Sequence, residues 1–145
     1  MNALLRFLCA GLTLSLTACS SFERDWRQAG TSGSKAAVPE RWEGRWTSAK
    51  HRGAGGRLRC VLQEADARQY RAQFRANWLL FTAGYTVPLN AERRGDELRL
   101  NGAQHIGGIG GGVYRYEGRV TRERFHASYH SSYDHGTFEM VPAAR

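Results

Sequence analysis

The densest group of ionisable side chains lies near the end of the chain, where His130, Asp134 and His135 occur within six residues. Histidine is the usual general acid or base near neutral pH and a common zinc ligand. His126 falls on the same face of a predicted strand as His130, but about 13 Å away at roughly 3.3 Å per residue, too far to share one metal ion. We predict a structural turn here, with a metal site or acid–base catalysis as the alternatives.

Other patterns for catalysis lack a required residue. The glycine-rich run 107–112 is followed by Val113 and Tyr114, whereas a phosphate loop ends in Gly-Lys-Ser/Thr and a dinucleotide fingerprint lies between a strand and a helix. We expect a bent connection, with a ligand portal as the alternative. No serine lies in a Gly-x-Ser-x-Gly motif, and no Cys–His pair is evident. We therefore predict a protein that is not an enzyme and needs no cofactor, and a hydrolase-like enzyme using the His/Asp cluster is the competing hypothesis.

Two of the three cysteines lie at the N-terminal end, in a segment built like an export signal. Arg6 gives a basic start, residues 7–16 form an apolar run, and small residues precede Cys19. The run is too short for a bilayer-spanning helix, which needs about 20 apolar residues, and it fits a signal peptide. Leu16-Thr17-Ala18-Cys19 resembles the lipobox of bacterial lipoproteins. That resemblance implies cleavage after residue 18, lipidation of Cys19 and, with Ser20 next, an outer membrane facing the periplasm in preference to the inner membrane.

The third cysteine, Cys60, alternates with Leu58 and Leu62. An unpaired cysteine in an exported protein can be reactive or form an intermolecular bond. Alternation with two leucines instead indicates a small apolar side chain inside the fold. We expect Cys60 to be buried.

The formal net charge is +8, and only Lys35 and Lys50 are lysines. The excess arginine fits either a solvated surface or attraction to an anionic component of the cell envelope. Nucleic acid is not expected as a partner, because no motif for it is present. An anion-docking role would use a basic wall of six outward arginines. These are Arg57, Arg59, Arg71, Arg75, Arg115 and Arg119.

Composition divides the chain into a signal peptide (1–18), a lipidated tether (19–40) and a folded domain (41–145). The tether contains the small, polar run 29–34 and is expected to be flexible coil. From residue 41 onward, apolar and polar residues alternate with a period of two, which is typical of half-buried strands. The predicted strands cover residues 42–47, 58–63, 69–78, 81–89, 97–101, 114–120, 125–130 and 136–140.

Eight short strands separated by turn residues predict an all-β domain, an eight-stranded antiparallel up-and-down barrel. Large aromatics share the inward face with alanine and glycine, as small barrels often require. These aromatics form either a solid core or the lining of a cavity for a small apolar ligand. The candidate ligand-binding residues are Phe74, Trp78, Tyr85, Tyr114, Tyr116 and Tyr129.

Gly44-Arg45-Trp46 resembles the Gly-x-Trp that opens the first strand of lipocalins and other calycins. The resemblance implies a calycin-like barrel with Trp46 packed across its bottom. Further motifs, among them Tyr70-x-Ala72-x-Phe74 and Tyr133-Asp134-x-Gly136-x-Phe138, resemble a group of small exported bacterial proteins and imply a fold but no activity. We therefore expect a membrane-anchored lipoprotein of the cell envelope whose barrel binds a small apolar ligand, or an envelope module that docks an anionic partner.

Overall fold

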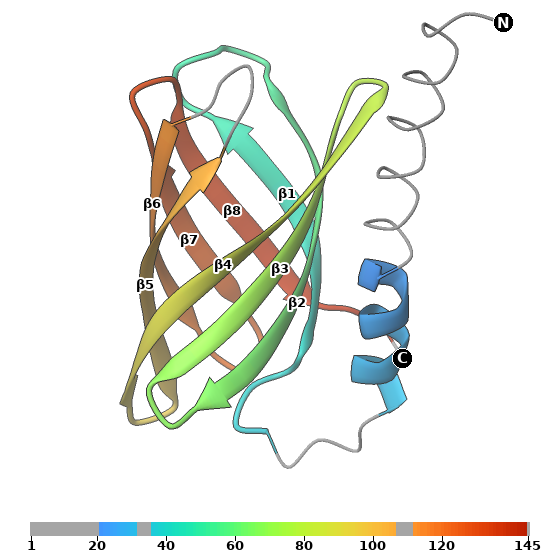
Figure 1. Cartoon of the computed structure of the whole chain (residues 1–145), viewed down its shortest axis with the longest axis vertical. Coiled ribbons are helices and arrows are strands. Elements are labelled where there is room, and N and C mark those ends of the chain that lie inside the picture. The colour runs from blue at the N-terminus through green and yellow to red at the C-terminus, as the bar shows by residue number, and fades with distance from the viewer. Residues whose placement is uncertain (1–20, 32–35, 107–111, 145) are drawn as a thin grey trace, which may run out of the picture.

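A computed structural model of the chain describes residues 21–31, 36–106 and 112–144. Cys19 and most of the glycine-rich run lie outside the described residues. The domain consists of eight strands in the order of the sequence (Figure 1). They are β1 (Arg41–Ser48), β2 (Gly55–Asp66), β3 (Gln69–Trp78), β4 (Phe81–Arg94), β5 (Glu97–Ile106), β6 (Gly112–Val120), β7 (Phe125–His130) and β8 (His135–Pro142).

The strands form one closed antiparallel barrel in which each pairs with its neighbours in sequence and β8 pairs with β1. This confirms the predicted fold class. Closure follows from the alternating pattern, because every strand has one apolar face to bury and the closed sheet leaves no edge unpaired. Four strands, β2, β4, β5 and β8, are at least three residues longer than predicted, and β4 continues from Leu89 to Arg94.

The two ends of the barrel differ. The lower end in Figure 1, which we call the closed end, is filled by a continuous apolar core. Trp42 is fully buried there; its indole nitrogen donates to the carbonyl oxygen of Pro39 at 2.7 Å, and its ring packs edge-on against Phe125. Cys60 is also fully buried, as predicted, and burial raises the pKa of its thiol well above the ordinary value.

Residues 21–31 form a helix that lies against the outside of the barrel beside β2 and β3 (Figure 1). We predicted flexible coil over residues 19–40, and this prediction is wrong for the helix. Phe22, Trp26 and Ala29 recur at the spacing of one helical face, and they pack on Val61, which points outward from β2 and is fully buried by the helix.

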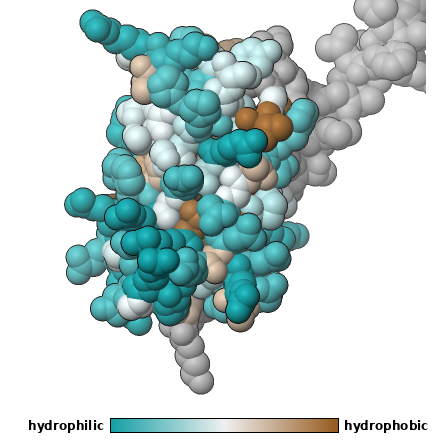
Figure 2. All heavy atoms as spheres, turned by 90° about the vertical axis from the view of Figure 1, so that its left-hand side faces the viewer, coloured by the Kyte–Doolittle hydropathy of each residue, from teal (hydrophilic) through white to brown (hydrophobic). Residues whose placement is uncertain are grey.

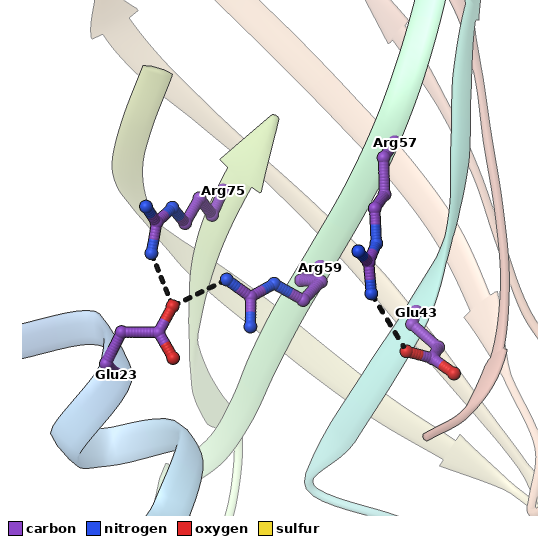
Figure 3. Close-up of polar contacts among 5 residues, drawn as sticks. All are labelled: Glu23, Glu43, Arg57, Arg59 and Arg75. Carbon is purple, nitrogen blue, oxygen red and sulfur yellow. Dashed lines mark hydrogen bonds and ion pairs between the residues drawn. The ribbon is translucent and has the colours of Figure 1, made fainter. Parts of the chain in front are cut away.

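Charge also fastens this helix to the barrel. The carboxylate of Glu23 accepts hydrogen bonds from Arg59, at 2.6 Å, and from Arg75 (Figure 3). The guanidinium of Arg59 lies 5.1 Å from the ring centroids of both Phe22 and Trp26, within the range of cation–π attraction. The hydrogen bond from Arg59, together with the charges of Arg59 and Arg75, lowers the pKa of Glu23.

The predicted basic wall is therefore not one surface. Arg59 and Arg75 bind the helix, whereas Arg115 and Arg119 belong to β6, which is separated from β2 and β3 by other strands on both sides. Figure 2 shows the face that lies on the left in Figure 1. It is mostly hydrophilic, with the most hydrophilic side chains gathered in its lower half. None of the described helices is long and apolar enough to cross a membrane.

Candidate functional site at the barrel mouth

The upper end of the barrel opens into a pocket of about 530 Å³. Five of the six aromatic residues predicted to line a cavity are in its wall, namely Trp78, Tyr85, Tyr114, Tyr116 and Tyr129. Sequence reasoning did not assign the remaining residues of the lining. These are Trp46, His51, Ala54, Ala76, Ala83, Ile106, Asp134 and Phe138.

The sixth predicted residue, Phe74, lies below this pocket and not in its wall. Its ring centroid is 5.3 Å from that of Phe138, 5.4 Å from Tyr85 and 6.3 Å from Tyr116. It lines instead an internal void of about 10 Å³, which is hardly enough for one water molecule. Phe74 is therefore part of the floor that separates the open upper half from the solid lower half. The inward aromatic residues form a solid core in the lower half and the lining of a cavity in the upper half.

Trp46 does not pack across the bottom of the barrel, as the Gly-x-Trp resemblance implied. It lies near the upper end of β1 and lines the pocket, while Trp42 occupies the closed end. The Trp46 indole nitrogen donates to the carbonyl oxygen of Asn77 in β3 at 3.0 Å. To reach β3, the Trp46 side chain crosses β2 at Gly56, the residue paired with Trp46. A Cβ at Gly56 would come 1.7 Å from that oxygen and 3.0 Å from the indole nitrogen. Gly56 is thus the missed sequence signal for this position.

The His/Asp cluster is divided between the inside and the outside of the barrel. Asp134 lines the pocket, where its carboxylate accepts hydrogen bonds from the Tyr129 hydroxyl at 2.9 Å and the Ser48 hydroxyl at 2.6 Å. His130 and His135 are paired across β7 and β8, with exposed rings 5.9 Å apart.

Because Tyr129, Ser48 and the backbone N–H of His135 occupy both oxygens of Asp134, this carboxylate orients a tyrosine hydroxyl in the pocket wall. The backbone of the turn is held by the hydroxyl of Ser131, which accepts from the N–H groups of Tyr133 and Asp134. These contacts fit the interpretation as a structural turn. Within the described ranges, no three His, Cys, Asp or Glu side chains are grouped so that they could hold a metal ion.

Three tyrosine hydroxyls are buried at the base and side of the pocket. Burial raises the pKa of Tyr85 well above its ordinary value, and the neighbouring Tyr116 adds to this effect. Burial also raises the pKa of Tyr116, and burial followed by the hydrogen bond to Asp134 raises that of Tyr129. All three are therefore neutral hydrogen-bonding groups at physiological pH, set among apolar walls.

A second hollow, of about 740 Å³, lies on the outer face over β5, β6 and β7. Its walls include Arg99, Arg115, Arg119 and His126, and two of these already have carboxylate partners, since Arg99 binds Glu97 and His126 binds Glu139. The barrel mouth is the better candidate for a ligand site. It combines aromatic walls with a few converging polar groups, which is the usual character of small-molecule sites.

Comparisons with protein-family models, with curated proteins and with solved structures return no match to this chain.

Proposed function

We propose that the barrel binds one elongated apolar molecule, such as a single acyl chain, in the pocket at its mouth. The observation that carries this proposal is the pocket itself: about 530 Å³ of space bounded by aromatic side chains, within the range of 300–1,000 Å³ typical of ligand sites. The solid floor at Phe74 and Phe138 limits how deep the ligand reaches.

The polar groups in the wall favour a ligand with a neutral head. Asp134 presents a carboxylate beside the hydroxyl of Tyr129, and a second carboxylate brought next to it in a desolvated pocket would be repelled. A hydroxyl head could instead donate to the Oδ2 atom of Asp134, which among the described residues accepts only from Tyr129, or to the hydroxyl oxygen of Tyr129. Monoacylglycerols and long-chain alcohols therefore fit this wall better than fatty acids.

Native mass spectrometry of the full chain released from detergent micelles tests this proposal. With added monoolein we expect one lipid bound per chain. Ala83→Phe places a ring in the pocket wall opposite the small Ala76 and is expected to abolish the adduct. Thr82→Phe, at the next position on the outer face of β4, is the matched control and is expected to keep it. Equal adducts in both variants would rule out the pocket as the binding site.

We also propose that the chain is a lipoprotein of the cell envelope with a calycin-like barrel, anchored through acylated Cys19. The lipobox-like Leu16-Thr17-Ala18-Cys19 and the closed eight-stranded barrel support this proposal. Two or more acyl chains hold a protein on a membrane, whereas one gives only marginal binding. Intact-mass measurement of the host-grown protein is expected to show a chain that begins at Cys19 and carries lipid, and an unmodified thiol at Cys19 would refute the anchor.

A further inference from the structure

The hairpin between β3 and β4 ends in four consecutive apolar residues, Trp78, Leu79, Leu80 and Phe81, at the rim of the pocket. We call these four residues the apolar tip. Their exposed fractions are 52%, 83%, 97% and 71%, the densest group of exposed large apolar side chains in the described part of the chain. Trp78 also lines the pocket. The apolar tip and the mouth of the pocket therefore form one continuous feature.

The backbone of the apolar tip is unfavourable for the residues it carries. Leu79 and Leu80 form the two-residue connection between the paired residues Trp78 and Phe81, and Leu79 has a φ of 52°. A two-residue turn with positive φ at its first residue alone normally has glycine at that position, because glycine tolerates positive φ. A leucine at this position costs backbone energy as well as exposing apolar surface. Folding in water favours neither leucine, which points to a binding role for both.

Charge is distributed unevenly between the two ends of the barrel. In the described segments around the mouth, the cations Lys50 and Arg52 are exposed, and the one carboxylate, Asp134, is turned into the pocket. Carboxylates are gathered toward the closed end instead. They include Glu64, Asp66, Glu92, Asp96, Glu97 and Glu123. These carboxylates are balanced by exposed arginines in the same turns, namely Arg68, Arg93, Arg94, Arg122 and Arg124. The closed end is therefore close to neutral, and an anionic surface would attract the mouth more strongly than the closed end.

The direction of the N-terminal helix agrees with this polarity. Its first turn contacts Arg75, near the upper end of β3, and its last turn at Gly30 lies against Arg41, at the lower end of β1. The helix thus begins at about the mid-height of the barrel, with its N-terminal end directed toward the mouth (Figure 1). An extended chain spans at most about 7 Å between Cys19 and Ser21. Along β3, Trp78 lies three residues beyond Arg75, which is a rise of roughly 10 Å at 3.3 Å per residue.

From these observations we infer that the mouth of the barrel docks on an anionic phospholipid surface, with the apolar tip inserted among the acyl chains. This inference deepens the proposed function and rests on it for the role of the pocket, because docking would set the pocket mouth directly against the membrane from which an acyl-chain ligand would come. Tryptophan is favoured at the level of the lipid headgroups, and each cation near an anionic membrane strengthens its binding.

Tryptophan quenching in vesicles tests the docking. The full mature chain is reconstituted into vesicles of brominated phosphatidylcholine and phosphatidylglycerol, and the difference between native and Trp78→Phe chains isolates the Trp78 signal. We expect at least half of this signal to be quenched. Leu79→Gly with Leu80→Asn places glycine at the positive-φ position of the turn, so it is expected to keep or raise the melting temperature while removing most of the quenching. Val141→Ser, at an exposed valine of the closed end, is expected to change neither.

The outcomes separate docking from anchoring and from ligand binding. Full membrane retention of the native chain without quenching of Trp78 would overturn the docking and leave the Cys19 anchor intact.

The Cys19→Ser chain is expected to cosediment with phosphatidylglycerol vesicles in low salt and to lose most of that binding in 0.5 M salt. A dimer that the variant Leu79→Gly with Leu80→Asn abolishes, with no quenching by bromolipid, would overturn the inference in favour of a second copy of the chain at the apolar tip. Quenching without a monoolein adduct would uphold docking and refute the ligand.

Discussion

At the scale of single residues, close approach of strands decides which positions tolerate a side chain. Gly44 of β1 faces β8, where an added Cβ would lie 1.9 Å from the carbonyl oxygen of Glu139 and 2.7 Å from the Cα of Met140. These are backbone atoms, so no side-chain rotation relieves the overlap. Gly84 of β4 differs, because the nearest atom to its added Cβ is 3.8 Å away. The two glycines belong to one barrel but have opposite constraints.

We therefore predict that Gly44→Ala lowers the free energy of unfolding by about 3 kcal/mol, the scale of an overpacked core. Gly84→Ala is the matched control and is expected to be neutral or to stabilise by about 0.5 kcal/mol, since glycine is costly within a strand. Urea denaturation followed by tryptophan fluorescence measures both changes. A loss of less than 1 kcal/mol in Gly44→Ala would contradict the contact geometry.

At the scale of elements, the N-terminal helix is held by a small apolar face and one shared carboxylate. Glu23 binds two arginines whose side chains are 21% exposed, while the nearby pair of Arg57 and Glu43 is longer, at 3.7 Å, and 66% and 39% exposed (Figure 3). Exposed ion pairs contribute at most about 1 kcal/mol. The carboxylate of Glu23 stabilises the folded state more than the exposed pair does, because it also offsets the repulsion between the two guanidinium groups that it binds.

Glu23→Gln is expected to destabilise the helix by about 0.5–1 kcal/mol at low salt and by less at high salt. Glu43→Gln, the matched control, is expected to have an effect close to zero. Because the folded-state pKa of Glu23 is lowered, its contribution is fully present above the unfolded value and is lost as the pH falls through the folded value. Hydrogen exchange of residues 21–31 between pH 7 and pH 3 measures both effects, and equal protection in the two variants would count against the assignment.

At the scale of the whole molecule, the barrel is solid below Phe74 and open above it. The closed half is filled by side chains such as Trp42 and Phe125, which supply most of the apolar burial that stabilises the fold. The open half contains the buried tyrosine hydroxyls and the pocket. Stability and candidate function are therefore assigned to opposite halves, so changes at the mouth need not unfold the domain.

The buried tyrosines predict alkaline sensitivity of the whole fold. The folded-state pKa values of Tyr85, Tyr116 and Tyr129 are raised above the unfolded value of about 10. The unfolded chain therefore loses these protons first as the pH rises, and stability falls above about pH 10 while remaining complete below it. Melting temperatures between pH 8 and pH 11 should show this fall, with a smaller slope in Tyr116→Phe. Tyr133→Phe, at an exposed tyrosine, should keep the native slope.

Much of the fold was determined by the sequence alone, because a period of two specifies which face of each strand is buried. That periodicity predicted the eight strands, the burial of Cys60 and five of the six aromatic residues around the pocket. The sequence also contained the helical spacing of Phe22, Trp26 and Ala29, but the small and polar residues that follow made this segment look like flexible coil.

The tertiary structure decided what depends on position along the barrel. Alternation places Phe74 and Tyr85 on the inner face alike, and the two residues are direct partners across β3 and β4. Only the tilt of the strands in the closed barrel puts Phe74 in the floor and Tyr85 in the wall. The same applies to Trp42 and Trp46, which share one face of β1 and lie at opposite ends of the barrel. Side-chain period specifies inside against outside, whereas height in a closed sheet is set by the register of all eight strands together.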